Sequence, residues 1–521
     1  MDRIKATLAT RGEALSRIDI RWYAALCSLL LSSWLIYTDG VVNNDGIIYL
    51  HSAQAFIDEG WSAAVAIYPW PFYSGLIALL HRALGISIEN VAYLINTALF
   101  VLVVTWFVSL VKEASASGKT ALYAALLILI LPVLNDYRAY TIRDVGYWAF
   151  YLGGLLYFLR YLRTPLPRFA FGWGACMLLA TLFRIEGLAF LVLIPLILLV
   201  LRPQAWSVRL RNFLNVNAVF FVVAIALLLL YGFSDIQFSG RLGDPILLAK
   251  ELVFSLREGV AEKADALEIA VLGKYTKDFA TSAVVIIMLT ILFSYLLFGF
   301  GFAHLLCTAQ GIWRAKILPE YRDSILLLSW AAAIHLAILV VFVTARFFMT
   351  GRFVVPLVLT LLVFAPLGLQ IFRERWKATG DQRPRPRRAW AYPALCVLLI
   401  VAAVDGSYSF GPSKKHLKEA GLWIDRNTPP ASKLLSNDGA VGYYANRELV
   451  LDPNKVETTH VERIASPESN VRADYLALNV KRRDSSGGDA FKKQFGDPLK
   501  RFRNNRGDQV LIYAVTNEKR D

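Results

Sequence analysis

Carboxylates and arginines gather near the ends of the apolar segments of this chain, and these residue types could do chemistry together. The acids are Asp45, Asp58, Glu59, Asp136, Asp144 and Glu186, and the bases are Arg138, Arg143, Arg184, Arg346 and Arg352. Ionised groups beside an apolar layer are costly, so they need a partner or a function. Guanidinium groups bind phosphate through paired hydrogen bonds, and a carboxylate accepts a proton from a hydroxyl. For any one of these residues, the alternative is an interfacial salt bridge or a solvated loop charge.

Asp45 is the strongest single candidate among the acids. It follows the first long apolar stretch, in the run Val41-Val42-Asn43-Asn44-Asp45-Gly46. The N-terminus is basic, and positively charged segments beside a span stay in the cytoplasm. We therefore predict that Asp45, beyond the first span, lies on the opposite side of the membrane. A lone carboxylate there could act as a general base on a hydroxyl outside the cytoplasm.

The composition defines the class of protein that must position these residues. The chain has 521 residues, of which 56% are hydrophobic and 13% aromatic, and its net charge is +15. Its mean hydropathy is +0.47. Soluble domains are less apolar, so we predict a polytopic α-helical membrane protein. The Lys and Arg residues stand between apolar runs, where they orient helices against membrane lipids, so we expect no nucleic-acid partner.

Apolar stretches long enough to approach a membrane span recur along the chain, and we predict about eleven transmembrane helices. They are Trp22–Tyr37, Val91–Val111, Ala121–Leu134, Val145–Leu162, Phe169–Phe183, Leu188–Leu201, Phe213–Phe233, Ala280–Leu306, Ile325–Thr344, Phe353–Ile371 and Trp390–Val404. Lys and Arg concentrate in alternate connections, which supports this order. We therefore predict a cytoplasmic segment 1–21 and a transmembrane catalytic domain 22–404.

Two of the outward segments, the first outer loop and the tail, are more than linkers. Residues 38–90 hold aromatic residues around Pro69 and Pro71, which predicts helices along the membrane surface, and residues 234–279 form a second long outer loop. Residues 405–521 are polar, and we expect a small extracytoplasmic α/β domain there. Its predicted elements are a helix at Lys414–Arg426 and strands at Lys433–Ser436, Asp474–Val480 and Gln509–Val515.

The motifs at the outward connections resemble those of the GT-C glycosyltransferases, in particular bacterial protein-O-mannosyltransferase-like and lipid A aminoarabinose-transferase-like branches. These motifs are Asp45-Gly46-Ile47-Ile48-Tyr49, Gly60-Trp61, Tyr68-Pro69-Trp70-Pro71, Arg143-Asp144, Arg184-Ile185-Glu186-Gly187 and Gly351-Arg352-Phe353 with Pro356. Gly46 stands where the family commonly has Glu. In the tail, Ala420-Gly421-Leu422-Trp423-Ile424, Ser436-Asn437-Asp438 and Tyr443-Tyr444-Ala445-Asn446-Arg447 are similar to the outer domain of these enzymes. The resemblance covers about residues 22 to 515.

This resemblance implies an inverting glycosyltransferase in the inner membrane. Its donor would be a polyprenyl-phosphate sugar, and its acceptor a lipid, glycan or protein group on the outer face. Asp45 would be the general base, with Asp144 as a second catalytic candidate. The substrate-binding candidates are Tyr49, Arg138, Arg143, Arg184, Glu186, Arg346 and Arg352.

No Rossmann fingerprint or phosphate loop occurs, which disfavours a nucleotide-sugar donor. His51 follows Tyr49 closely, but no ligand spacing accompanies it; we assign no metal and no certain cofactor, and leave a divalent metal open. A transporter or flippase of a lipid-linked or anionic substrate is the main alternative function. A noncatalytic scaffold that displays its outer domain is the third.

Overall fold

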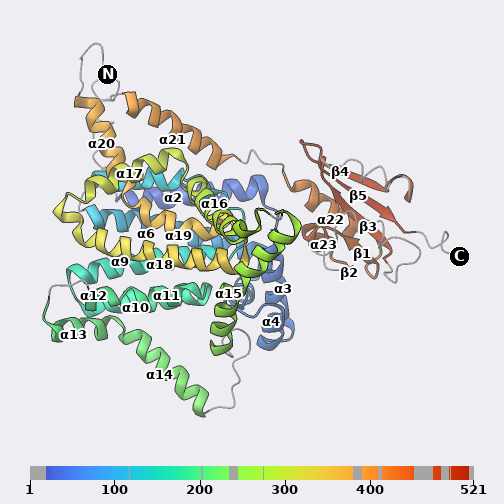
Figure 1. Cartoon of the computed structure of the whole chain (residues 1–521). Coiled ribbons are helices and arrows are strands. Elements are labelled where there is room, and N and C mark those ends of the chain that lie inside the picture. Colours follow the sequence, from blue (N-terminus) through green and yellow to red (C-terminus); the bar gives the residue numbers. More distant parts are fainter. Residues whose placement is uncertain are drawn as a thin grey trace, which may run out of the picture. The chain divides into compact units, whose positions relative to one another are not determined.

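A computed structural model gives the fold of this chain (Figure 1). It describes residues 19–115, 118–200, 204–233, 245–273, 275–378, 390–408, 413–450, 473–482, 492 and 495–515. Most of the predicted cytoplasmic segment 1–21, part of the outer loop 234–279 and several stretches of the tail lie outside these residues. The contacts divide the chain into two compact units.

The first unit, Met1–Ser32, Leu94–Arg138 and Arg143–Ser407, is helical throughout its described part. Its helices are α2 (Ile20–Asp39), α6 (Ile88–Ser115), α7 (Gly118–Leu129), α8 (Pro132–Asn135), α9 (Asp144–Arg163), α10 (Pro167–Phe183), α11 (Glu186–Leu193), α12 (Leu196–Val200), α13 (Trp206–Val216), α14 (Ala218–Phe233), α15 (Pro245–Ala270), α16 (Ala280–Phe300), α17 (Phe302–Ala315), α18 (Arg322–Arg346), α19 (Gly351–Leu362), α20 (Ala365–Ala378) and α21 (Ala391–Ser407). Two short 3₁₀ helices lie at Lys277–Phe279 and Pro319–Tyr321. The unit boundary falls within α2 and α6. Each predicted span contains a helix.

Several of these helices are shorter than the predicted spans. Among the described residues, four helical segments are long and apolar enough to cross a membrane alone, and up to six are if two bent pairs count as spans. The pairs are α13 with α14, bent by 57°, and α19 with α20, bent by 52°. Hydropathy averages over such breaks, so it joins two short helices into one stretch. The membrane-protein class is confirmed, whereas the predicted number of eleven spans is not.

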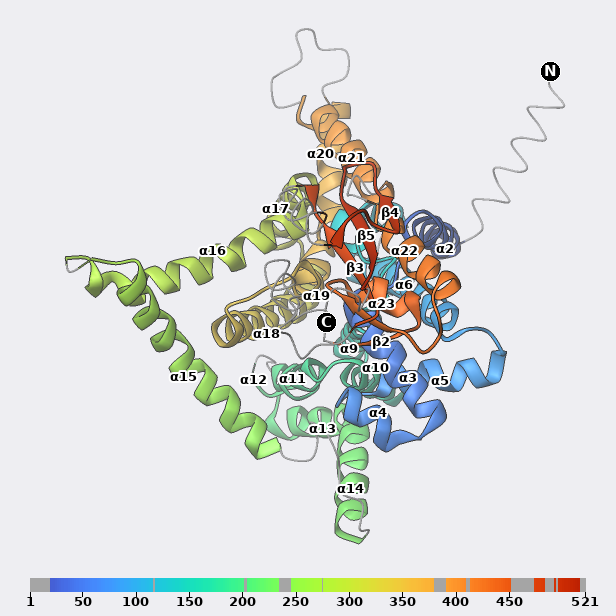
Figure 2. The ribbon, with the colours of Figure 1, turned by 90° about the vertical axis from the view of Figure 1, so that its right-hand side faces the viewer.

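Five helices of the first unit, α9, α10, α11, α18 and α19, pack against one another. Helix α9 packs against α10 and α18, α10 against α11, and α18 against α19. Figures 1 and 2 show α9, α10 and α11 beside one another. Trp148 and Phe158 on α9, and Trp173 on α10, are fully buried in this packing. Phe158 packs edge-on against Trp173, so these large side chains fill the contact between α9 and α10.

The second unit comprises Ser33–Tyr93, Ala139–Ile142 and Tyr408–Asp521. Helices α3 (Asn44–Asp58), α4 (Trp61–Ile67) and α5 (Phe72–Leu84) occupy the predicted outer loop 38–90. They pack on one another through apolar and aromatic residues such as Tyr49, Val65 and Tyr73, which are buried. Their position along the membrane surface stays a prediction.

The tail folds as an α/β domain, as predicted. Strands β1 (Lys433–Ser436), β2 (Glu448–Leu449), β3 (Tyr475–Val480), β4 (Lys500–Arg503) and β5 (Gln509–Ala514) form one sheet in the order β2-β1-β3-β5-β4. β1 is parallel to β2 and β3, while β5 is antiparallel to β3 and β4. Helices α22 (Lys415–Asn427) and α23 (Gly439–Ala445) pack on each other and on the sheet (Figure 2). Leu476, Leu478 and Leu511 lie in its core.

Candidate functional site

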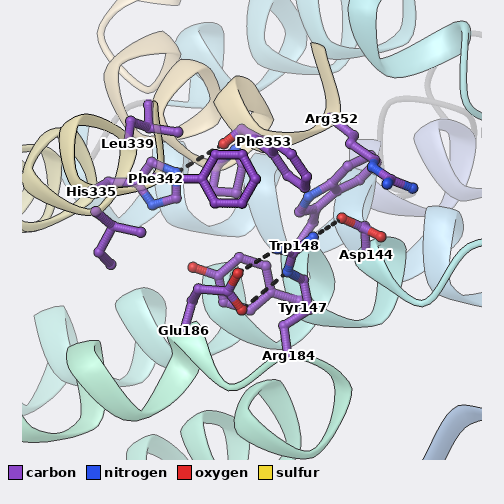
Figure 3. A pocket seen from close by; sticks show the side chains of 12 residues that line it. Asp144, Tyr147, Trp148, Arg184, Glu186, His335, Leu339, Phe342, Arg352 and Phe353 are labelled. Carbon is purple, nitrogen blue, oxygen red and sulfur yellow. Dashed lines mark hydrogen bonds and ion pairs between the residues drawn. The ribbon is translucent and has the colours of Figure 1, made fainter. Parts of the chain in front are cut away.

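A pocket in the first unit brings several of the predicted site residues together (Figure 3). Helices α9, α11, α18 and α19 and the turn between α10 and α11 supply its lining. The lining residues are Asp144, Tyr147, Trp148, Arg184, Glu186, His335, Ile338, Leu339, Phe342, Arg352, Phe353 and Pro356. The charged residues come from the starts of α9, α11 and α19 and from the α10–α11 turn. The apolar residues come mainly from α18 and α19.

Arg184 is the centre of an ion-pair cluster in this pocket. Its guanidinium donates one hydrogen bond to Asp144 and a forked pair to Glu186, in which the Nε–Oε2 distance is 3.2 Å. The side chains of Arg184 and Asp144 are 11% and 2% exposed. Buried charges of this kind persist only when they are paired, so Arg184 holds both carboxylates in place. The three groups together carry one net negative charge.

The local sequence explains why this cluster forms. Helix α10 ends at Phe183 and α11 begins at Glu186, so Arg184 lies in a very short turn. A Cβ on Gly187 would lie 2.7 Å from the backbone nitrogen of Thr181, so the close approach of the two helices requires glycine there. Asp144 is the first residue of α9, and a helix N-terminus stabilises a carboxylate.

Arg352 supplies a further guanidinium at the start of α19. Its Cζ lies 5.2 Å from the centre of the Phe353 ring, and the Cζ of Arg184 lies 4.9 Å from the same ring. Both guanidinium groups therefore lie over the Phe353 ring. The face of an aromatic ring attracts a cation, so Phe353 stabilises both arginines although it belongs to the apolar part of the pocket. This arrangement makes one end of the pocket charged and the other apolar.

Some buried polar atoms of the pocket have no hydrogen-bond partner among the described residues. They include the hydroxyl of Tyr147 and Nδ1 of His335, whose side chains are almost completely buried. The other ring nitrogen of His335 lies 3.1 Å from the Phe353 carbonyl oxygen. Buried polar atoms normally find a partner, so both atoms suit contact with a bound ligand.

Tyr147 and His335 were not predicted as site residues. Tyr147 follows Asp144 by three residues, which places both on one face of α9, and this spacing was an available signal. His335 stands in the middle of an apolar span, where a lone histidine carries no ligand spacing. Its place in the pocket depends on the packing of α18 against α11 and α19.

The other predicted arginines of the first unit lie outside the lining of this pocket. Arg138 is fully buried and donates to Asn135 at 2.7 Å, Ser28 at 3.0 Å and Ser32 at 2.8 Å. Arg143 directly precedes α9, at its N-cap position, and Arg346 is exposed at the end of α18. Their substrate-binding roles stay predictions, and Arg138 has an evident role in joining α2 to α8.

Asp45 and Tyr49 belong to the second unit. Asp45 is the second residue of α3 and is partly exposed. A Cβ on the adjacent Gly46 would lie 2.9 Å from Cβ of Thr141 and 3.0 Å from Oδ1 of Asn43, so a glutamate would not fit there unless its neighbours moved. Tyr49 is 5% exposed and packs edge-on against Tyr68 and Tyr73. It anchors α3 to the helices that follow.

Metal binding was left open by the sequence. In the part of the chain that the structure describes, no group of three or more His, Cys, Asp or Glu side chains could hold a metal ion. His51 instead lies beside Tyr443, with ring centres 5.8 Å apart.

Comparisons with known proteins identify the fold. No family model and no curated protein sequence matches this chain. The solved oligosaccharyltransferase of Archaeoglobus fulgidus, tethered to an acceptor peptide, matches with a TM-score of 0.55 and 14% identity, over 96% of this chain and 74% of that one. A structure of AglB from the same organism, with an inhibitory peptide and a dolichol-phosphate, matches with a TM-score of 0.52 and 14% identity, over 88% and 69%.

ArnT from Cupriavidus metallidurans is also similar, with a TM-score of 0.47 and 12% identity, over 97% of this chain and 98% of that one. At such identities the likeness shows the fold. The chain has the fold of the GT-C membrane glycosyltransferases, as its motifs predicted.

Proposed function

We propose that this protein is a membrane glycosyltransferase that moves a sugar from a polyprenyl-phosphate donor to a lipid, glycan or protein acceptor outside the cytoplasm. The observation that carries the proposal is the two-sided pocket of the first unit. Arg352 and the Arg184 cluster line one side, and Leu339 and Phe342 line the other. An isoprenoid phosphate has the same division, because an anionic head adjoins an apolar chain.

The relatives in fold support this class of donor. The similar AglB structure contains a dolichol-phosphate, and dolichol-phosphate is an isoprenoid phosphate. A membrane protein with the same fold, and with a pocket that is apolar at one end and carries the Arg352 guanidinium at its charged end, suits a ligand of that chemistry. We therefore assign the donor to the lipid-linked sugars rather than to nucleotide sugars.

The proposed reaction divides the charged residues by role. Asp45 takes the proton from the acceptor hydroxyl as the acceptor oxygen forms a bond to the anomeric carbon of the sugar. The bond between that carbon and the phosphate oxygen breaks, and the lipid phosphate leaves with the electron pair. Arg352 stabilises the departing phosphate through charge-assisted hydrogen bonds.

Arg184 has a different role in this proposal from that of Arg352. Its hydrogen bonds go to Asp144 and Glu186, so it fixes the charged wall of the pocket instead of gripping phosphate with its fork. Asp144 stays a candidate for contact with the donor sugar, because it lines the pocket.

We place the protein in the inner membrane, with its N-terminus in the cytoplasm and its C-terminal domain outside.

The experiment that tests the function is a transfer assay on the full chain in nanodiscs. Radiolabelled polyprenyl-phosphate sugars and cell-envelope extract are supplied to the wild type, to Asp45→Asn and to Asp58→Asn. Asp58 is a matched control, because it ends the same helix and its carboxylate accepts from Gln54. Transfer by the wild type and Asp58→Asn, but not by Asp45→Asn, supports the proposal. Absence of transfer from every donor by folded protein contradicts it and favours a transporter.

A further inference from the structure

The four residues between α2 and α3 lead directly to Asp45, and the C-terminal domain holds them in place. This connection runs from Gly40 to Asn43 and lies in the second unit. The backbone N–H of Val42 donates to the hydroxyl of Tyr444 at 3.2 Å. Oδ1 of Asn43 accepts from the backbone N–H of Thr141 at 2.8 Å. The connection is therefore fixed on both sides, two and three residues before Asp45.

Tyr444 is itself held by a charged pair. Its hydroxyl donates to Oε1 of Glu89 at 3.0 Å, and Nζ of Lys418 donates to the same oxygen at 3.1 Å. Nζ of Lys418 also lies 4.6 Å from the centre of the Tyr444 ring. Burial, followed by the charge of Glu89, raises the pKa of the Tyr444 hydroxyl well above its ordinary value. The phenol therefore stays protonated, so it can donate to Glu89 while it accepts from Val42.

The helix that carries Tyr444 is tied to the sheet of the C-terminal domain. Asp438 caps the start of α23 and accepts from the backbone N–H of Ala440 at 3.0 Å. The other carboxylate oxygen of Asp438 accepts from Nδ2 of Asn479 on β3 at 2.8 Å. A continuous series of bonded groups thus connects β3, through α23, with the residues that precede Asp45.

We propose that Tyr444 is a positioning residue, which holds the start of α3 so that the Asp45 carboxylate meets the acceptor hydroxyl in a reactive geometry. The inference rests on the proposed function, because it takes Asp45 as the base. It gives the C-terminal domain a part in catalysis, because Tyr444 belongs to that domain. Small displacements of a reacting group lower the rate strongly, whereas binding of the donor at a separate set of residues does not depend on them.

The test compares Tyr444→Phe with Tyr443→Phe in the full chain in nanodiscs. Tyr443 is a matched control on the same helix, with its ring centre 5.1 Å from that of Tyr444, and its hydroxyl makes neither the bond to Val42 nor the bond to Glu89. We expect Tyr444→Phe to lower kcat between about 10- and 100-fold, with the donor KM within about twofold of wild type. Backbone amide exchange in peptides covering residues 40–47 should be faster in Tyr444→Phe. Tyr443→Phe should match the wild type in all three measurements.

A second variant covers the event that Tyr444→Phe fails to fold. Glu89→Gln keeps an oxygen that can accept from Tyr444 but removes the charge, so kcat should fall in the same direction by a smaller factor. An unchanged kcat in Glu89→Gln, or in folded Tyr444→Phe, overturns the positioning role. If that happens while Asp45→Asn abolishes transfer, the proposed function stands without it. A wild type that moves no sugar overturns both.

Discussion

Arg184 and Asp144 form an ion pair across 40 residues of sequence, and it joins the end of α10 to the start of α9. The pair is nearly inaccessible to solvent, and Glu186 completes it from the start of α11. Three helix termini are thereby fixed at the charged wall of the pocket. Such a cluster constrains the geometry of a site, because each charged group depends on the others for compensation.

Replacing Arg184 with Met should destabilise the protein strongly. The substitution leaves the carboxylates of Asp144 and Glu186 without their cation in a largely buried site. Removal of one partner from a buried pair typically costs about 3–5 kcal/mol. Thermal unfolding of the purified protein in detergent measures the effect. Arg346→Met is the control, because Arg346 is exposed and a change there should alter the free energy of unfolding by less than about 0.5 kcal/mol. Equal unfolding temperatures for the two variants would contradict the structural role.

The sequence could predict several residues of the pocket, but it could not predict how they pair. The sequence placed Arg184, Glu186 and Arg352 among the candidates because charged residues at the ends of apolar stretches stand out. It could not pair Arg184 with Asp144, since that contact depends on how α9 packs on α10. Nor could it separate Arg184, which is bound to two acids, from Arg138, which donates to neutral oxygens.

The C-terminal domain shows the same division. Strands β1, β3 and β5 are apolar and were predicted to within one residue at each end. Strand β4, with the sequence Lys-Arg-Phe-Arg, was missed because an exposed edge strand lacks the apolar alternation of a half-buried one. The bond from Val42 to Tyr444 joins residues 402 positions apart, and no local pattern predicts it.

Replacing Arg352 with Ala should weaken donor binding more than replacing Asp144 with Ala. A charge-assisted hydrogen bond contributes about 1.5–3 kcal/mol, so we expect at least a tenfold rise in the Kd for a polyprenyl phosphate. Loss of Asp144 removes a negative charge from the pocket and should not weaken the binding of an anion. Binding of a labelled lipid phosphate to protein in nanodiscs measures both. Arg352→Lys should lie between wild type and Arg352→Ala, because it keeps the charge without the fork. Unchanged affinity in Arg352→Ala would argue against its role.

Gly46 offers a test of the packing around Asp45. A methyl group at Gly46 would lie within 3.0 Å of Thr141, Asn43 and Val42, so Gly46→Ala must displace the residues that precede Asp45. Overpacking of this kind costs about 1–3 kcal/mol, and transfer activity should fall with it. Gly75→Ala on α5 is the control, since its Cβ would meet only Trp61 at an ordinary 3.6 Å. Thermal unfolding and the transfer assay compare the two variants. If Gly46→Ala is as stable and active as Gly75→Ala, the neighbours of Gly46 can move aside for a methyl group without disturbing Asp45.

His416 on α22 should make the C-terminal domain less stable in acid. Burial lowers the pKa of its imidazole below the ordinary value of 6.5, although Asp438, Asp508 and Glu419 oppose the shift. The unfolded chain therefore binds the proton more readily than the folded domain. The stabilising contribution is complete above about pH 6.5 and decreases as the pH falls through that value towards the lower folded pKa. Amide exchange in peptides covering residues 413–427, measured at several pH values after correction for the intrinsic rate, should show decreasing protection in this range. His416→Gln should remove this component of the pH dependence, and an identical profile in the variant would assign it to other groups.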